Sequence, residues 1–332
     1  MNNLKKIGLT ALAGSLAAIS ANAAEMTVSG ASVLTYTSED STEVTGNPMG
    51  MKTNLSFTAS GEVNGYTVSY MQTSADQFAG MSSARLSVDM GDMGTLAFDQ
   101  GSGSGLATID DKTPTAAEEI WDGLDTTTSG RVGSAGNSGV FNYIKTIQNV
   151  TINAAMRKGH GTSNSDGGSS GGSDGTGMGA YDVALTTDGS SMGVDGITMG
   201  AGYGEATVGR GAGSNEDTDM TAFVNYAVGP VTLGMQVSKE DRTNGSTADQ
   251  ETLAWGVAFN VNENLSLSYG EREVDFIGIA TGATVTEKVE GIAAAYTMGS
   301  IKIAGNRNEG SNMAGSAASN DSMTEIAVSF AF

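Results

Sequence analysis

Residues 253–260 read LAWGVAFN, and after a short break residues 265–269 read LSLSY. Both stretches carry a large apolar side chain at every second position and a small or polar one in between. Successive side chains of a β-strand point to opposite faces, so this period of two predicts strands with one apolar face. The same alternation recurs in residues 220–228 and 231–238, and no segment longer than a turn or two has the period of a helix.

Segments of this kind continue outward to both ends of the chain and predict roughly sixteen strands. Most of them hold about 9 to 11 residues, the length that a tilted strand needs to cross the hydrocarbon of a membrane. The predicted strands are 26–37, 51–61, 65–73, 81–90, 94–100, 138–147, 149–158, 178–187, 195–205, 219–228, 230–239, 251–260, 264–273, 287–297, 300–308 and 322–332.

The connections between these strands alternate in length. Short ones are 63–64, 91–93, 229–230, 261–263 and 299–300, although 188–194 on the same side is longer. Long ones, rich in Gly, Ser, Asp and Asn, are 38–50, 101–137, 159–177, 206–218, 240–250, 274–286 and 309–321. Short turns on one side and long loops on the other are typical of a hairpin barrel threaded through a membrane. The pattern therefore predicts an all-β fold, a transmembrane antiparallel up-and-down β-barrel spanning residues 24–332.

The N-terminus has the three parts of a secretory signal peptide. Lys5 and Lys6 form a positive region, residues 7–19 are apolar or small, and Ala21 and Ala23 stand at the positions read by signal peptidase. The apolar part is too short to cross a bilayer as a helix. We expect residues 1–23 to be removed on export.

The composition limits which kinds of molecule the protein can bind. The formal net charge is −21, and removal of Lys5 and Lys6 with the signal peptide takes it to −23. Such a negative field repels nucleic acid and attracts cations. The chain has 48 Gly, 3 Pro and no Cys, so we expect an exported protein without disulfides.

The chain ends in 326-IAVSFAF-332, an alternating segment that closes on an aromatic residue. This ending resembles the C-terminal signal by which outer-membrane barrels are recognised for insertion. Residues 25–30 (EMTVSG) resemble a first strand. Residues 91–98 (GDMGTLAF) and 137–143 (NSGVFNY) resemble the strands before and after a constriction loop, although Met93 stands where relatives often have an aromatic residue.

On these segments the chain resembles the Gram-negative general porin family, in particular its alphaproteobacterial branch. The resemblance implies a sixteen-stranded barrel in the cell outer membrane, commonly a homotrimer, that passes small hydrophilic solutes and ions by diffusion. Ile326, Val328, Phe330 and Phe332 would then face outer-membrane lipid.

Segment 101–137 is the longest connection, and in the family the loop at this place folds inward as the third loop and narrows the channel. A narrow wet path between low-dielectric walls focuses the field of fixed charges, so carboxylates there favour cations. Thr115 to Leu124 could form one or two helical turns, with Thr115 as N-cap. The candidate acidic residues of this constriction are Asp110, Asp111, Glu118, Glu119, Asp122 and Asp125.

Family porins set a basic wall opposite the acidic loop. Strand parity places four basic residues on inward positions: Lys52, Arg85, Arg157 and Lys302. For each of them, an ion pair with a nearby acid at the barrel rim is an equally open interpretation. Four bases are too few to balance the loop, so the sequence predicts a net negative pore with a preference for cations.

Three other functions have weaker support. Enzymatic activity is not expected, because the one histidine, His160, has no nucleophile motif near it. Segment 171–175 (GGSDG) is similar to a calcium-binding repeat but occurs once. Structural Ca²⁺ at loop carboxylates stays open, with no other cofactor expected. The remaining alternative is a plugged outer-membrane barrel that acts as an adhesin or structural protein.

Overall fold

The computed structural model describes residues 25–39, 47–74, 81–125, 130–136, 138–158, 179–208, 215–243, 248–278 and 283–332. The predicted signal peptide (1–23), His160 and segment 171–175 lie outside these residues. In the described part of the chain, no helix is long and apolar enough to span a membrane.

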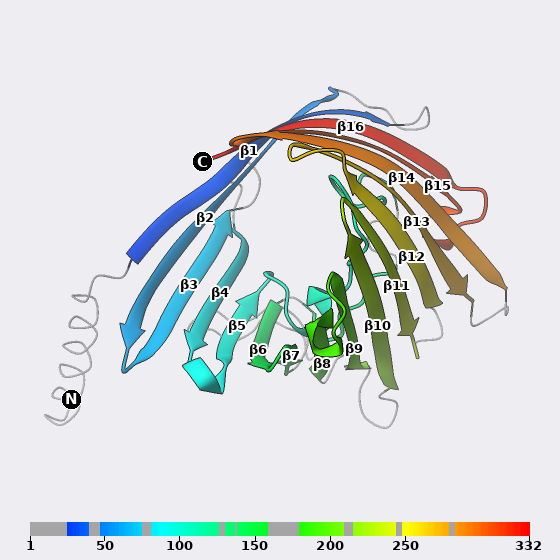
Figure 1. Ribbon diagram of the computed structural model, residues 1–332. Coiled ribbons are helices and arrows are strands. Elements are labelled where there is room, and N and C mark those ends of the chain that lie inside the picture. Colours follow the sequence, from blue (N-terminus) through cyan, green and yellow to red (C-terminus); the bar gives the residue numbers. More distant parts are fainter. Residues whose placement is uncertain are drawn as a thin grey trace, which may run out of the picture.

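Sixteen strands follow one another through the described residues and close into one barrel (Figure 1). Each strand pairs antiparallel with its neighbours in sequence, and β1 pairs with β16. The strands are β1 Glu25–Glu39, β2 Met49–Val63, β3 Tyr66–Ser74, β4 Met81–Asp89, β5 Thr95–Gln100, β6 Ser138–Ile147, β7 Val150–Arg157, β8 Gly179–Asp188, β9 Ile197–Val208, β10 Asn215–Val228, β11 Val231–Asp241, β12 Asp249–Asn260, β13 Leu265–Ile277, β14 Thr284–Met298, β15 Ile301–Ser311 and β16 Asn320–Ala331. The predicted all-β barrel is confirmed.

In the part of the chain that the structure describes, short 3-10 helices stand at four connections: η2 Gly91–Met93, η3 Gly105–Thr108, η4 Gly189–Met192 and η6 Met313–Gly315. The helix η4 accounts for the one longer turn on the short-turn side, 188–194. Its N-cap is Asp188, whose side chain accepts a hydrogen bond from the backbone N–H of Ser190.

The first and last strands close the barrel. Gly30 N donates to Phe332 O at 2.9 Å and Phe332 N donates to Gly30 O at 3.0 Å, so pairing continues to the last residue (Figure 1). An open sheet edge in hydrocarbon would leave backbone polar groups without partners, and closure removes that edge.

The two faces of the barrel differ as the alternation predicts. On β16, Ile326 and Phe330 are 50% and 45% exposed on the outer surface, and Phe332 beyond the strand is exposed too. Phe57 and Met51 of β2 also point outward. The apolar residues therefore form the surface that meets lipid, and the polar side chains of the intervening positions face the lumen.

Several strands extend further toward the long loops than the alternation predicts. β10 begins at Asn215 rather than 219, and β13 continues to Ile277 rather than 273. At these ends most outward positions are polar, such as Glu216 and Thr218 on β10 and Asp275 on β13. Just before the extension of β13, Glu273 forms an ion pair with Lys288 of β14. The hydrogen-bond ladder continues there, but the apolar alternation that marks contact with lipid has ended.

Candidate functional site: the loop inside the barrel

Loop 3 is the connection 101–137 between β5 and β6, and its described residues, 101–125 and 130–136, lie inside the barrel. Side chains from many strands of the wall bond to the backbone of these residues. Gly105 N donates to Asn153 Oδ1 at 2.8 Å, Ala116 N to Ser268 Oγ at 2.9 Å, and Asp125 N to Asp321 Oδ2 at 2.8 Å. Because these partners come from β7, β13 and β16, the loop crosses the lumen as predicted.

The two limbs of loop 3 meet at one buried carboxylate. Asp182 on β8 is 1% exposed. Its Oδ1 accepts from Leu106 N at 2.9 Å in the outgoing limb, and its Oδ2 accepts from Ala135 N at 2.8 Å in the returning limb. A single wall residue thus joins the start and the end of the loop.

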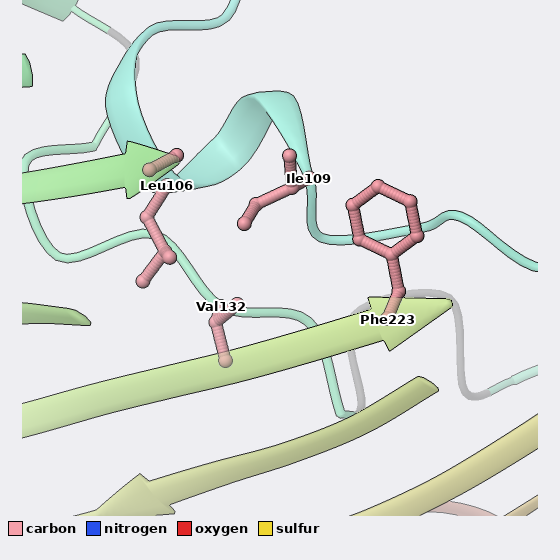
Figure 2. Packing of buried hydrophobic residues seen from close by; sticks show 5 residues of the cluster. Leu106, Ile109, Val132 and Phe223 are labelled. Carbon is pink, nitrogen blue, oxygen red and sulfur yellow. The ribbon is translucent and has the colours of Figure 1, made fainter. Parts of the chain in front are cut away.

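An apolar cluster supports this part of the loop. Leu106 and Ile109 of the outgoing limb pack with Val132 of the returning limb, and Ala184 and Phe223 of the wall complete the cluster. Figure 2 shows Leu106 and Ile109 extending toward the segment that carries Val132, with Phe223 projecting from β10 beside them. Burying side chains of this size stabilises by roughly 1.5–3 kcal/mol each.

A row of inward glycines lets the middle of loop 3 lie directly against the wall. Gly234, Gly256, Gly270 and Gly291 stand side by side on β11 to β14. A Cβ on Gly234 would overlap Pro114 Cδ, and a Cβ on Gly291 would lie 2.9 Å from Ile120 Cβ. The close approach of the loop therefore requires glycine at these two positions.

The predicted helical turns over 115–124 are wrong. This segment contains turns instead, in which Asp122 N donates to Glu119 O and Leu124 N donates to Trp121 O. The hydroxyl of Thr115 donates to Glu118 O at 2.7 Å. The same hydroxyl accepts from Ala117 N at 3.3 Å, as an N-cap can, but no helix follows and the segment remains a series of turns. Gly123, at a φ of +74°, then turns the backbone away from helical geometry.

Two of the six candidate acids form ion pairs within the loop. Asp110 pairs with Arg131 Nε at 3.2 Å, and Asp111 pairs with Lys112 Nζ at 3.4 Å. Burial, together with the neighbouring charge of Asp111, raises the pKa of Asp110 to about 6, although Arg131 opposes this shift. Asp110 therefore ionises near neutrality.

The other four acids, Glu118, Glu119, Asp122 and Asp125, form no ion pair with a described residue. Glu118 and Asp125 are exposed, and Glu119 and Asp122 are partly exposed. Burial and the nearby Glu119 raise the pKa of Asp122, while Lys52 lowers it. Glu325 on β16 is close enough to Asp122 for the two charges to interact. These carboxylates form the exposed, negative side of loop 3.

The four candidate bases all lie on the inward face but at different places. Lys52 on β2 faces the acidic side of the loop near Asp122. Arg85 forms an ion pair with Asp99 at 3.3 Å and donates to Gly103 O and Ser104 Oγ, so it holds the start of the loop. Arg157 Nη1 lies 2.9 Å from where a Cβ on Gly136 would stand, at the end of the loop. Lys302 pairs with Thr297 and Ser329 beside the turn 299–300.

Several residues that hold loop 3 were not singled out from the sequence. They include four acids of the wall that accept hydrogen bonds from loop 3: Asp99, Asp182, Asp219 and Asp321. Behind them, Glu240 pairs with Arg242 and Glu287 pairs with Arg272. Each of these acids stands at a strand position that alternates with outward residues, and this alternation could have placed it on the inward face from the sequence. Parity alone does not separate an acid that faces water from one that accepts a backbone N–H.

A metal site has no support in the described residues, where no three or more His, Cys, Asp and Glu side chains are grouped so as to hold an ion. The exposed acids of loop 3 are fixed charges along the lumen. Ions passing the loop would interact with their field.

Comparisons with known proteins agree with this geometry. The model of the Gram-negative porin family matches residues 8–312. The trimer form of OmpT, an outer-membrane protein of Vibrio cholerae, is 13% identical with a TM-score of 0.66, over 93% of this chain and 100% of that one. A variant of the Rh. blastica porin is 14% identical with a TM-score of 0.62, over the same shares.

A porin refined at 1.8 Å resolution is 14% identical with a TM-score of 0.66, again over 93% of this chain and 100% of that one. No curated protein sequence matches the chain. At these identities the solved structures establish the fold, and the family match extends over most of the sequence. The chain therefore belongs to the Gram-negative porin family and lies in the cell outer membrane.

Proposed function

We propose that the chain forms a water-filled channel for passive diffusion of small hydrophilic solutes and ions, with a preference for cations. The observation that carries this proposal is the exposed side of loop 3. There Glu118, Glu119, Asp122 and Asp125 form no ion pair with a described residue, and the charge of Lys52 acts on Asp122. Fixed negative charge in a wet path between low-dielectric walls enriches cations and excludes anions. The function involves no chemical step.

Single-channel recording in planar bilayers tests the channel itself. Pure protein should give stable conductance steps. A plugged barrel, such as an adhesin or a structural protein, would give none, and that result would remove the channel proposal.

Reversal potentials in a potassium chloride gradient test the cation preference. Neutralising Glu118, Glu119, Asp122 and Asp125 together should reduce the preference for potassium, and Lys52→Gln should increase it. Lys302→Gln is the matched control, because this second inward lysine lies beside the turn 299–300 and should change the potential less. A preference for chloride in the unchanged protein would contradict the proposal.

We further propose that the barrel assembles as a homotrimer and that residues 1–23 are removed on export. The trimer form of OmpT supports the first point, and the residue pattern at the N-terminus supports the second. The mass of the protein in mild detergent tests the trimer. N-terminal sequencing tests the cleavage and should begin at Ala24. A monomeric mass or an intact N-terminus would contradict the respective statement.

A further inference from the structure

The turn that carries Glu119 and Asp122 has a buried side as well as an exposed one. Trp121 and Leu124 of the same turn are 7% and 2% exposed. Because the carboxylates and the buried side chains belong to one short segment, whatever holds Trp121 and Leu124 also sets the place of the two carboxylates in the lumen.

The buried side packs against two different parts of the molecule. Val289 of β14 and Met323 of β16 belong to the barrel wall. Met313 belongs to η6, in the connection 312–319 on the long-loop side of the barrel, and is 2% exposed. The turn of loop 3 is therefore enclosed between the wall and a loop that comes from the outer side.

A series of polar contacts lies beside this apolar packing. The guanidinium carbon of Arg272 lies 4.3 Å from the ring centroid of Trp121. Arg272 Nη2 pairs with Glu287 Oε1 at 3.1 Å, with the two side chains 2% and 0% exposed. Glu287 Oε2 accepts from the backbone N–H of Ala314 at 2.8 Å. One buried ion pair thus connects the turn of loop 3 with the outer connection.

The outer connection is itself held in a defined shape. Asn312, Ala314 and Ala318 have φ values of 55°, 50° and 64°, which L-residues rarely adopt. Asn312 Nδ2 donates to Thr286 O at 2.9 Å, and Asn312 Oδ1 accepts from Ala318 N at 3.0 Å. Surrounding contacts therefore hold this backbone in a conformation that it would not keep by itself.

We propose that Arg272, Glu287 and Met313, here called the outer clamp, are positioning residues that hold Glu119 and Asp122 at their place in the channel. The outer connection 312–319 then controls the selectivity of a constriction that it does not itself line. This inference rests on the proposed function and adds the element that sets the geometry of its charged site.

Two substitutions that keep the net charge test the outer clamp. Arg272→Lys retains the positive charge but lacks the planar guanidinium that stacks on an aromatic ring and pairs in a fixed geometry. Met313→Ala removes the apolar contact from the outer side. Arg307→Lys is the control, because Arg307 is 49% exposed on the outward face and pairs with Glu309.

The readouts are the reversal potential in a potassium chloride gradient and the rate at which a charged thiol reagent modifies Asp122→Cys, introduced with each substitution. The natural chain has no cysteine, so the reagent has one target. We expect both clamp variants to shift the reversal potential without any change of charge. We also expect the rate at which the reagent modifies the thiol of Asp122→Cys to change by about fivefold or more. Loss of one buried contact changes the equilibrium between two positions of the turn by about this factor.

The outcomes separate the two proposals. The outer-clamp proposal would be overturned if Arg272→Lys, Met313→Ala and Arg307→Lys all conduct and have equal reversal potentials and equal modification rates. Absence of conductance in the unchanged protein would overturn the proposed function instead. If Arg272→Lys does not yield a folded barrel, Met313→Ala decides the question, because its side chain belongs to the connection and not to a strand.

Discussion

Asp110 gives loop 3 a pH dependence that belongs to a single side chain. Its pKa of about 6 exceeds the usual value of 3.8, so the folded protein binds this proton more tightly than the unfolded chain does. Ionisation of Asp110 therefore lowers stability as pH rises from about 3.8 to about 6. In the channel, the same carboxylate gains its charge near pH 6.

We expect the cation preference to fall as pH is lowered from about 7 to about 5, with a midpoint close to the pKa of Asp110. Protonation removes one negative charge and leaves Arg131 without its ionised partner. Reversal potentials measured across this range check the prediction. Asp110→Asn should abolish the step, whereas Glu309→Gln, on the outward face, should retain it. A step of equal size in Asp110→Asn would show that another group titrates.

The inward parity of Lys52, Arg85, Arg157 and Lys302 could be read from the sequence, but their contacts could not. Arg85 bonds to the backbone of loop 3, while Lys302 stands beside a turn at the other end of the barrel. Both follow the same alternation rule. The rule predicts which face of the strand a residue occupies. It does not predict at which position along the barrel axis a distant loop crosses that strand.

At the scale of elements, loop 3 depends on the inward glycines of the wall. Gly234→Ala would place a methyl group that overlaps Pro114 Cδ and Oδ1 of Asn225, whose Nδ2 donates to Lys112 O of the loop. Forcing extra volume into a packed contact typically costs about 1–3 kcal/mol, here through displacement of loop 3 while the strand remains paired. We expect an altered single-channel conductance and a lowered midpoint of unfolding in urea.

Gly305→Ala is the matched control for this prediction. Gly305 is also a strand glycine, but a Cβ there would meet its nearest neighbour, Glu325 O, at 3.5 Å, an ordinary contact. We expect it to leave conductance unchanged. Equal conductance changes in the two variants would mean that the wall glycines do not serve the loop.

The course of loop 3 shows where local patterns stop being informative. Thr115 followed by Glu118 has the spacing of a helix start, yet the segment forms turns because Thr115 donates to Glu118 O and Gly123 takes a positive φ. The wall supplies acceptors such as Ser268 Oγ for backbone groups that a helix would otherwise satisfy internally. Contacts between residues more than a hundred positions apart therefore decide its conformation.

At the scale of the whole molecule, the difference between the outward and inward faces of one strand is testable at two consecutive residues. Phe57 is 43% exposed on the outward face of β2, and Thr58 faces the lumen. Phe57→Lys places a charge in apolar surroundings and should lower the free energy of unfolding by about 2–4 kcal/mol. Thr58→Lys should change it by less than about 0.5 kcal/mol.

Equilibrium unfolding in urea from lipid vesicles measures both changes. Thr58→Lys should in addition reduce the cation preference, because it adds a base to the lumen, whereas Phe57→Lys adds none there. Similar destabilisation in the two variants would contradict the assignment of the faces.

The sequence by itself determined the barrel. A period of two repeated along the chain, together with short and long connections in alternation, specifies strands, their order and the face that meets lipid, because each of these depends on neighbours in sequence. It also showed the longest connection and its acids, and the resemblance to the porin family indicated that this loop enters the lumen. Only the tertiary structure decided which acids remain exposed there, which wall carboxylates hold the loop, and that Arg272 and Met313 enclose its turn. These contacts join side chains on strands that are far apart in the chain. The alternation within one strand shows which face a residue occupies, but it does not show which distant residue will contact it.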